Sequence, residues 1–177
     1  QVAWHSVGNK RIMFDITIIA PCSPEKLYQS LSNKYSAIEP NIWAAMLAES
    51  SRRNGFGVSI IDMDALRLSP EETAQIVVDN PCRLVLFVAT GQNPNASSAS
   101  MTGAIDASEA IKSLLPRQMI AFVGPHVNAL PLETLEQEPS IDIVFTNEGV
   151  YALHNLLLTD LSDEGLKKTR GIAYKNK

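Results

Sequence analysis

The segment Leu84–Thr90 constrains the fold most, because an unbroken apolar run leads up to the polar Thr90. A strand without polar alternation is buried on both faces, as in the parallel sheets of α/β proteins. A strand of such a sheet places its binding residues just beyond its carboxyl end. The run therefore predicts both a class of fold and the edge of the sheet at which a ligand would bind.

Strand and helix patterns alternate along the chain. The predicted strands cover 14–20, 58–62, 84–90, 119–123 and 142–146. The predicted helices cover 40–54, 69–80, 101–115, 132–137 and 148–159. This alternation with right-handed crossovers predicts a doubly wound, Rossmann- or flavodoxin-like α/β fold, with five parallel strands in three α/β/α layers. The expected strand order is 2-1-3-4-5.

The helix that begins after Ser69 has the clearest start signal. Ser69 suits the N-cap, Pro70 suits the first helical position, and Glu71 and Glu72 place negative charge in the first turn. Each satisfies free N–H groups or the positive end of the helix dipole. The beginning of this helix is therefore predicted to the residue.

Composition excludes several classes of protein. A chain of 177 residues, 45% of them hydrophobic, can bury the core of one domain. No apolar run reaches the roughly 18–20 residues that cross a bilayer, so no membrane partner is expected. The formal charge of −4 and the scattered Lys and Arg argue against nucleic-acid binding. Cys22 and Cys82 are the two cysteines, which is typical of a reduced, cytoplasmic protein and too few for a four-thiolate zinc or iron–sulfur site.

The turn after strand 119–123 is Gly124-Pro125-His126. A glycine lets the backbone approach a ligand closely, and Pro125 fixes the turn. His126 is open to three interpretations: a metal ligand, an acid or base, or a turn residue bonded to backbone. Because no second ligating residue stands at the right spacing, neither a metal site nor a catalytic residue is predicted.

Two further segments are candidates for ligand binding. The polar segment 91–100 is predicted as a long loop after the most buried strand, and its hydroxyls and amides suit a neutral, amide-rich ligand; the alternative is a surface loop. The segment 147–149 opens the last predicted helix, where free N–H groups favour ligand acceptors. Glu148 is equally suited to face the helix dipole.

The motifs of common enzymes are missing. The first strand is followed by Ala20-Pro-Cys-Ser-Pro24, without the glycines of a dinucleotide site, and no P-loop, nucleophile elbow or triad is present. Cys22 stands where a site is expected, but nothing near it in sequence would lower its pKa, so a small buried thiol is the interpretation. Two alternatives stay open: a flavodoxin-like domain for another small molecule or a protein partner, and a small hydrolase or transferase using Cys22 or His126.

Four segments together resemble the N-terminal cobalamin-binding domain of cobalamin-dependent radical S-adenosylmethionine (SAM) enzymes. They are E-P-N-I-W-A-A-M-L-A at 39–48, G-F-G-V-S-I-I-D-M-D at 55–64, V-G-P-H-V-N-A-L-P-L-E-T-L at 123–135 and I-D-I-V-F-T-N-E-G at 141–149. The likeness covers about 14–160. It implies cobalamin on the carboxyl edge of the sheet, with the serines of 97–100 as partners for its amides and nucleotide tail. The residues that the resemblance assigns to cofactor contact are Pro21, Cys22, Ser23, Asn41, Thr90, Gly91, Gln92, Asn93, Ser97, Ser98, Ser100, Met101, Gly124, Pro125, His126, Val127, Asn147, Glu148 and Gly149.

The sequence departs from relatives of that group at three places. The D-x-H-x-x-G motif, whose histidine ligates cobalt, is replaced by Pro21-Cys-Ser-Pro-Glu-Lys26, so the resemblance implies a displaced tail (base-off) without a histidine ligand. Asn41-Ile42 stands where Leu-Gly is frequent. The C-x-x-x-C-x-x-C cluster motif is absent, so SAM and a 4Fe-4S cluster would belong to a missing domain in cis, and this chain alone would not perform the radical step.

The resemblance also implies a domain organisation. Residues 1–13 are an N-terminal arm, 14–160 the cobalamin-binding domain, and 161–177 a linker or strand towards the radical SAM domain. The expected function is to present the corrinoid for methyl transfer or related radical chemistry.

Overall fold

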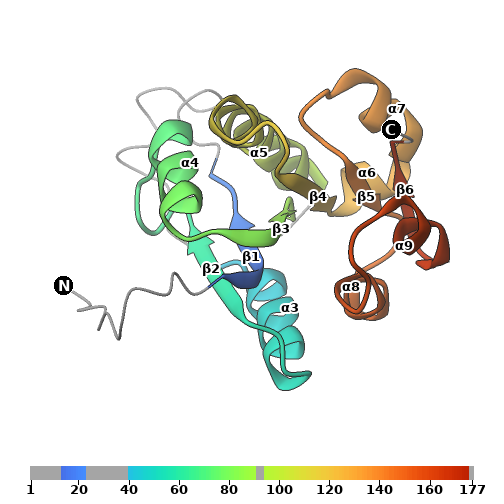
Figure 1. The fold of residues 1–177 in the computed structure, drawn as a ribbon. Coiled ribbons are helices and arrows are strands. Elements are labelled where there is room, and N and C mark those ends of the chain that lie inside the picture. Colours follow the sequence, from blue (N-terminus) through green and yellow to red (C-terminus); the bar gives the residue numbers. More distant parts are fainter. Residues whose placement is uncertain (1–12, 23–39, 91–93, 176–177) are drawn as a thin grey trace, which may run out of the picture.

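The computed structural model describes residues 13–22, 40–90 and 94–175, without the side chains of 94–99. These residues form a three-layer α/β/α fold around a six-stranded sheet (Figure 1). The strand order is β2-β1-β3-β4-β5-β6. The predicted fold class and the order 2-1-3-4-5 are confirmed.

The first five strands are parallel. Their bounds are β1 Phe14–Ala20, β2 Val58–Asp62, β3 Cys82–Val88, β4 Met119–Val123 and β5 Ile143–Phe145. The prediction of five strands was wrong by one, because β6 (Ile172–Tyr174) pairs antiparallel with β5. Its residues were interpreted as a linker or strand towards another domain. That they also lead there stays a prediction.

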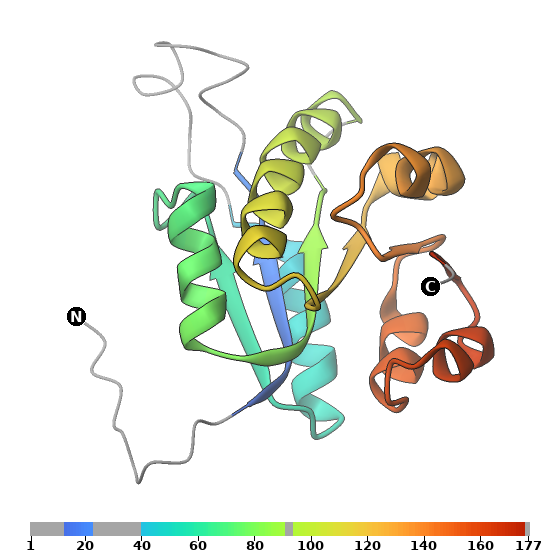
Figure 2. The same cartoon turned by 45° about the horizontal axis from the view of Figure 1, so that its top comes forward.

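Seven helices are described around this sheet. They are α3 Ile42–Arg53, α4 Pro70–Asp79, α5 Pro94–Leu114, α6 Pro125–Ala129, α7 Pro131–Gln137, α8 Val150–Leu157 and α9 Asp163–Lys168. Buried residues of α4, α5, α6 and α7 pack on one face of the sheet, and those of α3, α8 and α9 pack on the other (Figures 1 and 2). No helix of the described residues is long and apolar enough to span a membrane.

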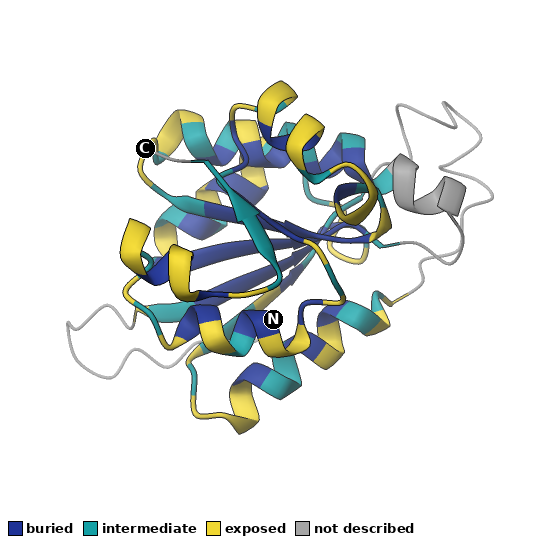
Figure 3. Ribbon diagram, turned by 90° about the vertical axis from the view of Figure 1, so that its right-hand side faces the viewer, coloured by how far each residue is buried: buried dark blue, intermediate teal, exposed yellow. Residues whose placement is uncertain are grey.

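The core follows from the alternation of side chains along each strand. On β3, Val85 and Phe87 belong to the cluster under α4 and α5, whereas Leu84 and Leu86 belong to the cluster under α3 and α8. All four are fully buried, so the apolar run that predicted a two-sided burial is confirmed. Figure 3 shows the buried strands between helices whose outer turns are exposed.

Local start signals were accurate where a polar side chain could cap a helix. Ser69 accepts a hydrogen bond from the Glu72 N–H at 3.1 Å, and the Glu72 carboxylate accepts one from the Ser69 N–H at 2.8 Å. This is the reciprocal capping box that the Ser-Pro-Glu-Glu order favours.

Two predicted loops are helical instead. Helix α5 begins at Pro94, so most of the predicted loop 91–100 is wrong. Proline is favoured at the first helical position, and the small residues after it contain no helix breaker. The Gly-Pro-His turn opens the short helix α6, because Gly124 is its N-cap and Pro125 its first residue.

Candidate functional site

The carboxyl ends of the five parallel strands bring the predicted binding segments to one edge of the sheet. The strands end there at Ala20, Asp62, Val88, Val123 and Phe145. Helices α3, α5, α6 and α8 each begin at this edge, since each follows a parallel strand directly or through a loop. We call it the carboxyl edge.

Gly124, directly after β4, lies against the backbone of Ala89, directly after β3. A Cβ atom on Gly124 would lie 2.2 Å from the carbonyl oxygen of Ala89, and its φ of +153° is a conformation that residues with side chains rarely adopt. The Ala89 N–H also donates to the Val123 oxygen at 2.9 Å. The closeness of these two strand ends is therefore sufficient to explain why a glycine is needed at position 124. The approach of a ligand to Gly124 stays a prediction.

Asn41 connects the start of α3 with the end of β3. Its Oδ1 accepts from the Ala44 N–H at 3.0 Å as the helix cap, and its Nδ2 donates to the Val88 oxygen at 3.0 Å. The Thr90 hydroxyl donates to the same Oδ1 at 3.2 Å. Asn41 thus contacts Thr90, a second predicted site residue, and links the start of α3 to the end of β3.

The segment after β5 is held from two sides. Gly149 is the N-cap of α8 with φ +86°, and its N–H donates to the Asn147 Oδ1 at 2.7 Å. The indole N–H of Trp43, on α3, donates to the Glu148 oxygen at 3.1 Å. Trp43 was not among the predicted site residues. Its place two residues after the N-cap Asn41 was the available signal.

The first turn of α6 and the part of α5 around Met101 each contain both buried and more exposed residues. Pro125 is exposed and His126 half-buried in the first turn of α6, whereas Val127 is fully buried in the core. Met101, seven residues beyond the first residue of α5, is buried in the same core, and Ser100 is half-buried. His126 is thus available to a ligand from this edge, and Val127 and Met101 act through packing.

The ends of β1 and β2 carry a thiol and two carboxylates. The Cys22 thiol donates to Asp64 Oδ1 at 3.1 Å, and Pro21 beside it is half-buried. Asp62 Oδ1 accepts from the backbone N–H groups of Asp64 and Ala65 at 3.1 and 3.0 Å, which closes the turn after β2. The structure corrects one part of the interpretation of Cys22 as a small buried thiol, because Cys22 is half-buried.

Six of the predicted site residues cannot be placed among these contacts. Ser23, Gly91, Gln92 and Asn93 lie outside the described residues, and Ser97 and Ser98 lie in α5 without described side chains. Within the described residues, no three His, Cys, Asp or Glu side chains gather as a metal site.

A separate hollow opens at the opposite, amino edge. It has a volume of about 620 Å³ and is lined by Cys82, Arg83, Leu114, Leu115, Pro116, Arg117, Gln118, Met119, Asp160 and Leu161. The Arg83 guanidinium donates to the Asp15 carboxylate at 3.2 Å and to the backbone oxygens of Leu157 and Thr159. Burial raises the pKa of the Cys82 thiol. The Arg83 guanidinium of this hollow is therefore engaged within the protein, whereas Arg117 is exposed.

The chain matches a known family over most of its length. The model described as B12 binding domain matches residues 29–157. No curated protein matches the chain.

Three solved structures share the fold. The radical SAM methyltransferase TsrM from Kitasatospora setae, with tryptophan substrate and a SAM analogue, superposes with a TM-score of 0.68 at 14% identity, covering 92% of this chain and 28% of TsrM. TsrM from Kitasatospora setae with cobalamin and a 4Fe-4S cluster superposes with a TM-score of 0.66 at 14% identity, covering 93% of this chain and 28% of TsrM. The cobalamin-dependent SAM radical enzyme OxsB superposes with a TM-score of 0.66 at 17% identity, covering 93% of this chain and 21% of OxsB. The chain thus spans about a quarter of the length of these enzymes.

The matched residues contain the features that the resemblance used. They include strands β2 to β5 and helices α3 to α8, and with them the segments 124–127 and 147–149 at the carboxyl edge. The superpositions extend the likeness in fold to more of the chain, since they cover 92–93% of it. The chain therefore belongs to the B12 binding domain family, whose cofactor is cobalamin.

Proposed function

We propose that this chain holds cobalamin at the carboxyl edge of its sheet and presents it to a radical SAM domain for methyl transfer. The observation that carries the proposal is the family match over 29–157, which contains three of the predicted binding segments, 91–101, 124–127 and 147–149. Ligands of open α/β sheets bind outside the carboxyl ends of the strands, which supports the same location.

The donors and acceptors at this edge fit a cofactor with neutral amide side chains. Asn41, Thr90 and Asn147 place uncharged amide and hydroxyl groups at this edge, where they bond one another or the neighbouring backbone. Helix α8 begins at Val150, and its N-cap Gly149 gives the N–H groups of the first turn no side-chain cap. These residues, with His126 and the backbone around Gly124, would hold the corrinoid. Bound cobalamin would supply a cobalt centre able to carry a methyl group, a chemistry that no side chain of the chain provides.

Retention of a corrinoid tests the proposal directly. The purified protein mixed with hydroxocobalamin is expected to elute from gel filtration with the red cofactor at close to one equivalent per chain, measured by absorbance. A colourless protein peak under several buffer conditions and cobalt oxidation states would overturn the proposal.

We infer that cobalt has no histidine ligand from this chain. The segment 21–39 contains no histidine, and His126 belongs to the first turn of α6. His126→Ala is therefore expected to retain hydroxocobalamin within about twofold of the unchanged protein, since one half-exposed hydrogen bond is worth little. The reduced Co(II) form should show an electron paramagnetic resonance spectrum without nitrogen splitting; a nitrogen splitting that disappears in His126→Ala would identify His126 as a ligand.

The proposed partner is a radical SAM domain in the same polypeptide. TsrM and OxsB are SAM radical enzymes of which the match covers 28% and 21%, which supports a module within a longer enzyme. Neither cysteine forms a disulfide, which fits the cytoplasm. The coding sequence on the carboxyl side of Lys177 tests the partner, because a C-x-x-x-C-x-x-C motif is expected there.

A further inference from the structure

The first turn of α3 reaches both strands that flank β4. Asn41 Nδ2 donates to the oxygen of Val88, the last residue of β3, at 3.0 Å. Trp43 Nε1 donates to the oxygen of Glu148, just after β5, at 3.1 Å. Because β4 lies between β3 and β5 in the sheet, this turn bridges the carboxyl edge beside the end of β4.

The segment after β5, residues 146–149, depends on contacts of its own as well. Asn147 Oδ1 accepts the Gly149 N–H at 2.7 Å, and the Thr146 N–H donates to the Gly171 oxygen at 3.0 Å. A Cβ atom on Gly171 would lie 2.2 Å from Asn147 Nδ2, so the asparagine side chain is closely packed against the turn before β6. These contacts hold one side of the segment, and the indole of Trp43 holds the Glu148 carbonyl on the other.

We propose that Trp43 is a positioning residue for cobalamin, acting through the Glu148 carbonyl rather than by contact with the cofactor. The inference rests on the proposed function. A segment that is already held in its binding conformation loses less conformational entropy when a ligand binds. The bond joins residues 105 apart in sequence, so it sets the position of the segment relative to α3 and, through Asn41, relative to the end of β3.

Packing by the indole has to be separated from its hydrogen bond. Trp43 packs against the core under α3 and α8, so its removal also costs stability. Trp43→Phe keeps one aromatic ring but removes the N–H donor together with part of the apolar surface of the indole, so it needs a control that removes apolar packing alone. The matched control is Phe56→Leu, which removes an edge contact with His154 of α8 (ring centroids 6.0 Å apart) beyond the far end of α3.

The experiment measures corrinoid affinity and local backbone protection in the same variants. Titration with hydroxocobalamin is expected to show about threefold weaker binding for Trp43→Phe, less than the value of a buried hydrogen bond because the bond to Glu148 is exposed. Amide hydrogen exchange of residues 146–149 without cofactor should become faster in this variant. Phe56→Leu should lower the melting temperature while its affinity and the exchange of 146–149 stay unchanged.

Each outcome separates the inference from the proposed function. If the unchanged protein retains cobalamin and Trp43→Phe binds it equally well, the inference is wrong and the proposed function stands. If Phe56→Leu loses as much affinity as Trp43→Phe, Trp43 acts only through stability. If the unchanged protein retains no corrinoid, the proposed function fails, and the inference with it. Should Trp43→Phe not fold, benzothienylalanine at position 43 keeps the two-ring shape without the N–H and gives the same test.

Discussion

Gly124→Ala is expected to lower the free energy of unfolding by about 3 to 5 kcal/mol. The added Cβ would lie 2.2 Å from the Ala89 carbonyl oxygen, a distance that no side-chain rotation can relieve because both atoms are fixed by the backbone. The φ of +153° adds strain of its own. Chemical denaturation of purified protein, monitored by circular dichroism, measures the loss.

Gly55→Ala is the matched control for this prediction. Gly55 also has a positive φ, +88°, but a Cβ there would meet no atom within 4 Å. Its substitution is expected to cost about 1 kcal/mol, from backbone strain alone. Equal losses in the two variants would show that the contact with Ala89 is relieved by a small shift of the strand ends.

The same variant bears on how the cofactor site is interpreted. Since Gly124 is required by the approach of β3 and β4, loss of cobalamin in Gly124→Ala would follow from distortion of the edge. It would not demonstrate contact between the glycine and the corrin. Variants such as Trp43→Phe and His126→Ala, which leave the strand ends unchanged, are the ones that report on the cofactor.

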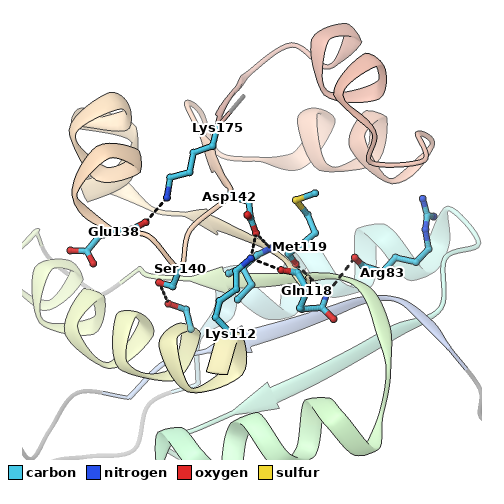
Figure 4. A network of polar contacts seen from close by, with 10 residues as sticks. Arg83, Lys112, Gln118, Met119, Glu138, Ser140, Asp142 and Lys175 are labelled. Carbon is cyan, nitrogen blue, oxygen red and sulfur yellow. Dashed lines mark hydrogen bonds and ion pairs between the residues drawn. The ribbon is translucent and has the colours of Figure 1, made fainter. Parts of the chain in front are cut away.

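Asp142→Ala is expected to lower the free energy of unfolding by about 2 to 4 kcal/mol, because it leaves a largely buried ammonium without its partner. Asp142 Oδ2 accepts from Lys112 Nζ at 2.7 Å and from the Ile120 N–H at 2.8 Å. The two charged side chains are only 19% and 13% exposed. Figure 4 shows this carboxylate between the end of α5, the start of β4 and Lys175 after β6.

The network around Asp142 extends to the last described residues. Lys112 Nζ also donates to the Gln118 oxygen at 2.7 Å, and Lys175 Nζ donates to the Glu138 oxygen at 2.7 Å (Figure 4). Burial lowers the pKa of Lys175, and the Asp142 carboxylate opposes that shift. Removing Asp142 therefore weakens the support of two ammonium groups at once.

A double-mutant cycle measures how much the ion pair between Lys112 and Asp142 contributes to the free energy of unfolding. Lys112→Met alone should cost less than Asp142→Ala, because the remaining carboxylate keeps the Ile120 N–H. The double variant should be more stable than the sum of the two losses predicts, since no unpaired charge is left. Glu49→Ala, which removes the exposed ion pairs with Arg52 and Arg53, should leave stability unchanged. If the losses of unfolding free energy in Asp142→Ala and Lys112→Met are strictly additive in the double variant, the two side chains have no coupling energy.

The layers of the fold were predictable because they depend on patterns within single segments. The apolar run before Thr90 requires burial on both faces, and the order Ser69-Pro-Glu-Glu contains every group of its capping box. The motifs at 123–135 and 141–149 led to the right family through their resemblance to known domains. Their common place at the carboxyl edge has a general reason. Strand ends of a parallel sheet share one edge, so residues that follow strands in sequence lie together in space.

The errors lie where distant residues decide the structure. The segment 161–177 was predicted as a linker or strand, but the antiparallel pairing of its residues 172–174 with β5 depends on the edge that β5 offers, which 172–174 alone do not encode. The early start of α5 was hidden by serines and asparagines that are as common in loops as in first helical turns. The reason for Gly124, the contact with Ala89, joins two separate strands.

The sequence alone thus determined the doubly wound parallel sheet with its carboxyl edge and, by resemblance, the family, since hydrophobic period, capping and strand-end motifs act over a few residues. Only the tertiary structure decided how that edge is built: Asn41 on the end of β3, Trp43 on the Glu148 carbonyl, Gly124 against Ala89, and β6 beside β5. These contacts join segments up to 105 residues apart. They arise only after the sheet has brought its strand ends together, because no pattern within either segment encodes its distant partner.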